Sequence, residues 1–306
     1  MQTHCQKTIF GNDTWVVLSN IEQSIKTKVE SLGTPIKDWN VNIFRGILTG
    51  FNDAFVINTD QRNEILQRCQ TDEEKKHTEE IIRPILRGRD IRKYSYDWEE
   101  RWLIWIPWHF PLHHDLSIQG ASEDAEKAFS LLYPSVYQHL IKYKEPLSKR
   151  NKAETGIRYE WYALQRWGAN YWDEFSKPKI MYPNMTKFIP FYYDNKGFYQ
   201  NDKAFMITGK HVEFLTAFLN SSLFKFCFLN NFPELQGGTR ELRKIFFEKI
   251  PVIEVTDSIN QEFKVLIDDI QKSYTKEKAI VIDNLIFDLY QLTEDERKII
   301  GYIEIM

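Results

Sequence analysis

The sequence has no long apolar run and no paired cysteines. None of its apolar stretches approaches the roughly 20 residues that a membrane-spanning helix needs, and Met1 to Phe10 lacks the apolar core of a secretory signal. The three cysteines, Cys5, Cys69 and Cys227, are widely separated. We therefore expect no disulfide framework, and these absences together predict a cytoplasmic protein without a membrane partner.

Catalytic sequence motifs are also missing. The chain has no Gly-x-Gly-x-x-Gly or Walker loop to hold phosphates, and no Gly-x-Ser-x-Gly elbow to present a nucleophile. Asp257, Glu262 and Lys264 fit a nuclease-like Asp…Glu-x-Lys pattern, but they fall on a predicted helix. A chain with 27% charged residues contains such triplets by chance. The sequence therefore predicts a module without a catalytic centre.

Charged and aromatic residues are distributed unevenly. The whole chain has a net charge of -3, but residues 254–306 carry 12 acidic and 6 basic side chains, so residues 1–253 have a net charge of +3. Residues 141–190 hold 10 Lys and Arg against 5 Asp and Glu, together with ten aromatic side chains. Basic residues interleaved with aromatic ones favour a nucleic-acid-binding face in this part of the chain.

The spacing of apolar residues predicts both helices and strands. Helices are predicted over residues 14–32, 211–228, 240–247 and 258–290. Apolar runs of strand length are predicted over residues 102–106 and 179–182. Thr293 to Glu296 has the form of a capping box that opens a last helix.

Six segments follow one another in an order that is shared with a known family. They are FRGILTGFNDAFVI at 44–57, RPILRGRDI at 83–91, KPKI at 177–180, a segment at 214–221 that ends in LNS, the segment 237–251 that begins GGTR, and IFDLYQLTEDE at 286–296. Each segment is short. Together and in this order they resemble the TaqI-like C-terminal specificity domain of type IIG restriction-modification enzymes and adenine-specific DNA methyltransferases.

The resemblance implies an α+β fold of the target-recognition-domain type. We expect a mixed, mostly antiparallel twisted sheet with packed helices, followed by a helical C-terminal segment. We divide the chain into an N-terminal helical linker over 1–35, a target recognition domain over 36–255 and a C-terminal helical segment over 256–306.

The resemblance also implies that the chain reads a short double-stranded DNA sequence through the major groove. Methyltransferase and nuclease domains, with their S-adenosylmethionine and magnesium, are then expected elsewhere in the same polypeptide or complex, and no cofactor is expected in this chain. An amino-methyltransferase needs an Asn-Pro-Pro-Tyr-type loop that holds the flipped base. The nearest tetrapeptide here, Asn231-Phe232-Pro233-Glu234, lacks the paired prolines and the aromatic ring.

Three groups of residues are candidates for contacts with DNA. The first group is Arg83, Arg87, Arg89, Arg92 and Lys93; the second is Lys149, Arg150, Asn151, Lys152, Arg158, Arg166, Lys177, Lys179 and Lys187; the third is Gly238, Thr239 and Arg240. Arginine can make bidentate contacts with phosphate or guanine, whereas lysine holds phosphate. The third group is predicted to clamp a phosphate at the start of the helix 240–247.

Structural roles remain open for the same residues. Arg89 and Asp90 could instead fix the local fold, Trp161 and Trp167 could belong to a core, and Thr239 could only cap a helix. We also keep two other function classes open. His109, His113, His114 and Asp115 could hold the metal of a hydrolase, although Pro107 and Pro111 disfavour a regular helix there. The helices predicted after residue 257 could serve a protein-interaction module.

Overall fold

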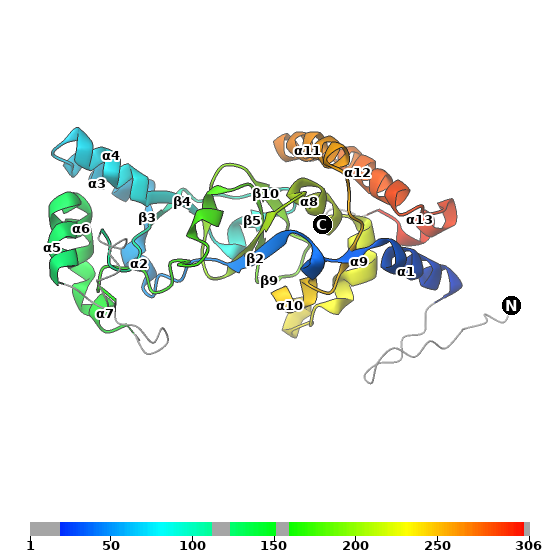
Figure 1. Cartoon of the computed structure of the whole chain (residues 1–306), viewed down its shortest axis with the longest axis horizontal. Helices are drawn as coiled ribbons and strands as arrows, with labels where there is room; N and C mark the ends of the chain where they lie inside the picture. The colour runs from blue at the N-terminus through cyan, green and yellow to red at the C-terminus, as the bar shows by residue number, and fades with distance from the viewer. Residues whose placement is uncertain (1–18, 112–122, 151–158, 303–306) are drawn as a thin grey trace.

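The computed structural model describes residues 19–111, 123–150 and 159–302. The described part of the molecule is elongated, with helices at both ends and strands between them (Figure 1). Helices α3 to α7 lie at one end, whereas α1, α8, α9 and α11 to α13 gather at the other. Two four-stranded sheets and three two-stranded pairs connect these ends.

The first four-stranded sheet is antiparallel and has the order β10-β8-β12-β2. Its strands are β2 (Val41–Arg45), β8 (Lys179–Pro183), β10 (Tyr192–Asp194) and β12 (Ala204–Gly209). Ile207 of β12 lies opposite Ile43 on one side and Ile180 on the other. Every residue of β8 is buried, as expected for a strand that is covered on both faces. The predicted strand at 179–182 is therefore confirmed.

The second four-stranded sheet has the order β11-β4-β7-β3. Its strands are β3 (Val56–Asn58), β4 (Ile82–Leu86), β7 (Arg101–Ile104) and β11 (Tyr199–Gln200). Strand β11 pairs with β4 in parallel, and the other two pairings are antiparallel. Strand β7 confirms the strand predicted around 102–106, shifted toward the N-terminus.

Three short antiparallel pairs complete the strands. They are β1 (Thr34–Pro35) with β14 (Pro251–Val252), β5 (Ile91–Arg92) with β6 (Ser95–Tyr96), and β9 (Met185–Thr186) with β13 (Arg240–Glu241). Each pair joins segments by backbone hydrogen bonds. The β9/β13 pair joins segments that lie more than fifty residues apart in the sequence.

Helices α2 to α7 cover one end of the second sheet. Their bounds are α2 (Asn52–Phe55), α3 (Thr59–Arg68), α4 (Asp72–Ile81), α5 (Glu123–Leu132), α6 (Pro134–Leu140) and α7 (Lys144–Ser148). Aromatic rings fill the core here: Phe129 stacks on Tyr162 with ring centroids 4.4 Å apart. Trp161 is buried in the same cluster and Trp167 packs against it, so both belong to the core.

The helices at the other end share a second core. Their bounds are α1 (Asn20–Leu32), α8 (Val212–Leu219), α9 (Ser222–Phe228), α10 (Lys244–Phe247), α11 (Asp257–Lys272), α12 (Lys276–Leu289) and α13 (Glu294–Ile300). Phe214 of α8 and Phe263 of α11 meet edge to face, with ring centroids 5.0 Å apart. Lys28 of α1 is 2.7 Å from Glu296 of α13, so the first and last described helices are joined directly.

The observed architecture confirms the α+β fold with mostly antiparallel strands. The capping box at Thr293 and Glu296 is present. The predicted helix 211–228 is two helices, because Ser221 caps a new start at α9. The division into three segments stays a prediction.

The predicted helix 240–247 is wrong in its first half. Gly237 and Gly238 both have positive φ angles, of 75° and 77°, and turn the chain back. Arg240 and Glu241 then pair with β9 as a strand, and α10 begins only at Lys244.

No single helix among the described residues is long and apolar enough to cross a membrane. Val212–Leu219 and Ser222–Asn231 pass such a test only as a pair, by length and composition, with a 67° bend between them. Every residue of α8 is buried in the core except Glu213.

Candidate nucleic-acid interface

Arg87, from the first predicted group, has partners within the protein. Its Nε and Nη2 atoms donate to the Asp90 carboxylate at 2.9 and 2.7 Å, and Nη2 also lies 2.6 Å from Glu99. The hydrogen bond to Asp90 raises the pKa of Arg87 above its ordinary value. Gly88 is needed beside it, because a Cβ there would come within 2.5 Å of the Lys203 carbonyl oxygen. This segment therefore fixes the local fold around Asp90, which is buried.

The other members of the first group differ in exposure. The side chains of Arg89 and Arg92 are 70% and 50% exposed, and their ion pairs with Glu99 and Asp97 lie at the surface. Such pairs contribute little to stability, so a phosphate could replace the carboxylate. Lys93 is partly buried, and this burial lowers its pKa to about 8. Arg83 lies within β4 and is partly buried.

Two members of the second group are buried. The Lys179 side chain is fully buried, and its Nζ is 2.6 Å from Asp194 and donates to the Phe175 carbonyl at 2.6 Å. Arg150 is also buried and donates to the carbonyl oxygens of Thr49 and Trp161. Burial lowers the pKa of Arg150 to about 10. Neither side chain reaches the surface in this conformation.

The rest of the second group is spread over the molecule. Lys149, Arg166, Lys177 and Lys187 have exposed side chains, and Lys149 and Lys177 pair with carboxylates on their own turns. Asn151, Lys152 and Arg158 lie outside the described residues. The structure therefore does not bring the whole 141–190 stretch onto one face.

The third group lies at a turn between extended segments, so the predicted helix-terminus clamp is wrong in its geometry. Arg240 donates to the Phe232 carbonyl at 2.9 Å and to the Glu234 carboxylate at 2.8 Å, and its side chain is 18% exposed. Thr239 follows the Gly237-Gly238 turn and caps no helix start. The guanidinium therefore holds the turn.

The β9/β13 pairing brings Lys187 to this turn, which the sequence did not predict. Arg240 pairs with Thr186, and the Lys187 Nζ lies 3.9 Å from the position that a Cβ on Gly237 would occupy. Two segments predicted separately to contact DNA are therefore neighbours. The only sequence signal was the pair of glycines, which marks a turn but not its partner.

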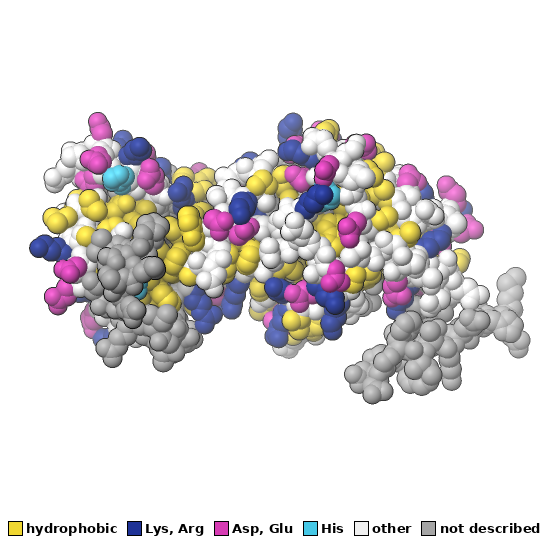
Figure 2. Space-filling model, in the orientation of Figure 1, with side chains coloured by type: hydrophobic (Ala, Val, Ile, Leu, Met, Phe, Trp, Pro, Cys, Tyr) yellow, Lys and Arg dark blue, Asp and Glu magenta, His cyan; other side chains and the backbone are white. Residues whose placement is uncertain are grey.

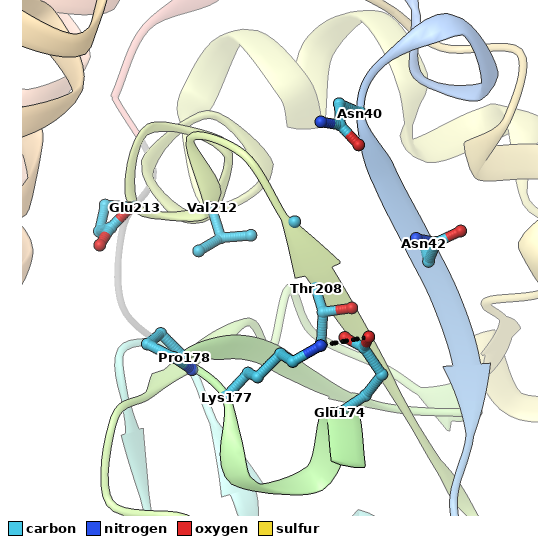
Figure 3. A pocket seen from close by; sticks show the side chains of 9 residues that line it. Asn40, Asn42, Glu174, Lys177, Pro178, Thr208, Val212 and Glu213 are labelled. Carbon is cyan, nitrogen blue, oxygen red and sulfur yellow. Dashed lines mark hydrogen bonds and ion pairs between the residues drawn. The ribbon is translucent and has the colours of Figure 1, made fainter. Parts of the chain in front are cut away.

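A polar cavity of about 430 Å³ opens elsewhere, at the ends of β2 and β12 (Figure 3). Asn40 and Asn42 lie on one side, and Lys177 donates to Glu174 on another. Thr208 also lines it, and its buried hydroxyl has no hydrogen-bond partner among the described residues. The cavity can accept a polar group, but Lys177 is its only residue among the DNA-contact candidates.

The described residues contain no group of three or more His, Cys, Asp and Glu side chains that could hold a metal. His109 is 3.0 Å from Glu160, which is buried, and its backbone φ is 60°. His113, His114 and Asp115 lie outside the described residues. The hydrolase alternative therefore gains no support from His109.

Comparison of the sequence with known protein families identifies the family of this chain. The family model of the TaqI-like C-terminal specificity domain matches residues 83–252, which is more than half of the chain. The chain belongs to this family. The type II methyltransferase M.MjaIV of Methanocaldococcus jannaschii is 22% identical over 293 residues, which cover 91% of this chain and 87% of that protein.

Two solved structures share the fold of this specificity domain. The type IIG restriction endonuclease BpuSI matches 89% of the chain with a TM-score of 0.50 and 15% identity. The type IIL restriction-modification enzyme MmeI, solved in complex with DNA, matches 92% with a TM-score of 0.51 and 13% identity. The chain spans 34% and 37% of these two proteins, respectively, or about a third of their length.

Proposed function

We propose that this chain is the double-stranded DNA recognition module of a restriction-modification enzyme. The match of residues 83–252 to the specificity-domain family carries this proposal. The relatives, a type II methyltransferase and two restriction enzymes, support a role in the same kind of system. Since the chain spans about a third of the solved enzymes, the methyltransferase and nuclease domains, with S-adenosylmethionine and magnesium, would lie in the same polypeptide or complex.

The exposed candidates form the proposed DNA surface. These are Arg89, Arg92, Lys149, Arg166, Lys177, Lys187 and Gly238, and the partly buried Thr239 follows Gly238. Lysine and arginine at phosphates give affinity that is independent of sequence, whereas contacts with base edges give specificity. Arg87, Arg150 and Lys179 have their internal partners and would support this surface from beneath.

Fluorescence anisotropy with a labelled random-sequence duplex tests the proposal directly. We expect binding at low salt that weakens steeply as salt rises, because released counterions drive phosphate binding. Selection of bound duplexes from the random pool then reports any sequence preference. Absence of binding at low salt would count against DNA recognition.

A separate experiment tests whether methyl transfer and DNA cleavage depend on domains outside this chain. We expect the purified chain to transfer no labelled methyl group from S-adenosylmethionine and to cleave no DNA with magnesium. Incorporation of label into DNA would place the methyltransferase in this chain and overturn that part of the proposal.

A further inference from the structure

The β9/β13 ribbon, defined as residues 184–188 and 232–242, exposes large apolar side chains. Phe188 is 61% exposed, Met185 is 53% exposed and Leu235 is 41% exposed, while Ile245 on the adjoining α10 is 55% exposed. Hydrophobic side chains around α10 are bordered by Lys, Arg, Asp and Glu side chains at the lower margin of the molecule (Figure 2). An apolar group of this kind in a charged border marks a binding surface.

Phe188 is held in place although its ring is exposed. The Thr186 hydroxyl accepts a hydrogen bond from the Phe188 amide and donates to the Phe188 carbonyl, both at 3.0 Å. Beneath the ribbon, Phe232 packs on Phe247 with ring centroids 4.8 Å apart. The ring is therefore presented from an ordered turn on a packed base, which lowers the entropic cost of binding.

The charge of the ribbon and α10 suits a polyanion. Residues 184–188 and 232–249 contain five basic and three acidic side chains. No ion pair between described residues involves Lys187 or Lys249, and both are exposed. A Cβ on Gly238 would meet nothing within 4 Å, so a phosphate backbone can approach this turn closely.

We propose that Phe188, together with Met185, is an apolar wedge that enters a base step of duplex DNA while Lys187 contacts a neighbouring phosphate. This inference rests on the proposed DNA-binding function and adds a mode of contact to it. Apolar side chains such as Phe and Met unstack base steps and kink the duplex when basic residues hold the flanking phosphates. An exposed aromatic ring beside free lysines fits this partner better than it fits an apolar protein surface.

Phe188→Ala and Phe188→Trp test the wedge against a random-sequence duplex that carries a donor and an acceptor dye at its ends. We expect the wild-type chain and Phe188→Trp to bring the ends closer. Phe188→Ala should lose this bend and bind about 5- to 150-fold more weakly, the range expected for one stacked base. Val265→Ala on α11 is the matched control, since Val265 is also 61% exposed but lies on the opposite side of the molecule from α10 (Figure 1).

Each remaining outcome decides between the wedge and its alternatives. Met185→Ala leaves the Thr186 turn intact and should reduce the bending of the duplex in part. It replaces Phe188→Ala as the test if that variant fails to fold. Normal bending and affinity in folded Phe188→Ala protein would overturn the wedge and leave DNA binding standing. Absence of binding by the wild-type chain would instead overturn the proposed function itself.

Discussion

The 82–92 segment and the β9/β13 ribbon each contain an inward-turned arginine, Arg87 and Arg240, but their glycines and their surfaces differ. In the first, Arg87 is turned onto Asp90 and Glu99, and Gly88 packs against the Lys203 backbone. In the second, Gly238 faces open space, and Lys187 and Phe188 are exposed. The first segment carries one of the family's motifs and builds the scaffold. The ribbon also carries part of a family segment, the one over 237–251, but it presents a free surface.

A basic residue in a DNA-recognition domain is therefore not by itself a contact with DNA. Lys179 and Lys187 were predicted for the same role, yet one is fully buried and the other is exposed. Substitutions of each kind have different consequences, and they test this comparison from the largest expected effect to the smallest.

Replacing Lys179 should have the largest effect. Lys179→Met leaves the buried Asp194 carboxylate without its cationic partner, so we expect the free energy of unfolding to fall by about 3–5 kcal/mol in urea denaturation. Lys177→Met is the matched control, because Lys177 is half-exposed and pairs with Asp173 and Glu174 at the surface. Its expected cost is about 1 kcal/mol or less. Equal losses of unfolding free energy in the two variants would contradict a structural role for the buried Lys179.

Lys93 should make the stability depend on pH. Its pKa is lowered to about 8 in the folded chain, against 10.5 for an ordinary lysine, so folding is penalised while the group stays protonated. The penalty is complete below pH 8 and is removed as the pH rises from 8 toward 10.5. Relative to Lys93→Met, the wild-type chain should therefore gain about 2 kcal/mol between pH 7 and about pH 9.5.

Urea denaturation of the two proteins across this pH range measures the difference. Lys203→Met is the control, because the Lys203 side chain is 68% exposed. If the free energies of unfolding of the wild type and Lys93→Met differ by the same amount at every pH, Lys93 is solvated, as a DNA-contacting residue would be.

Arg240 should act on the stability of the ribbon rather than on DNA directly. Arg240→Ala removes the hydrogen bond to the Phe232 carbonyl and the ion pair with Glu234, so we expect a loss of about 1 kcal/mol. Arg243→Ala, at a side chain that is 58% exposed, should cost about 0.5 kcal/mol or less. Unchanged stability in Arg240→Ala with a salt slope lowered by about one would restore the phosphate clamp predicted from the sequence.

Local sequence signals predicted the elements that depend on neighbouring residues. The Thr293 capping box and the strand at 179–182 were both recovered, because caps and apolar runs are set within a few residues. The order of the six family segments gave the fold class. What failed was the prediction of a helix over 240–247, where a long-range pairing with β9 overrides the local preference.

The roles of the basic residues could not be read from local sequence for the same reason. Lys179 is buried because Asp194 lies opposite it on β10, and Arg150 is buried because the Thr49 carbonyl lies beside it. These partners are 15 and 101 residues away in the sequence. Neither partner is visible in the local pattern of charges.

Lys187 should have the smallest effect on stability and a clear effect on DNA binding. Its side chain is exposed and takes part in no ion pair between described residues, so Lys187→Ala should change the free energy of unfolding by less than about 0.5 kcal/mol.

If the Lys187 Nζ neutralises one phosphate, Lys187→Ala should make the slope of log affinity against log salt shallower by about 0.9, equally for all duplex sequences. Lys298→Ala on α13, at another exposed lysine on a distant helix, should leave the slope unchanged. Anisotropy titrations over a series of salt concentrations measure both slopes. Equal slopes for the two variants would remove Lys187, and with it the phosphate side of the ribbon, from the DNA surface.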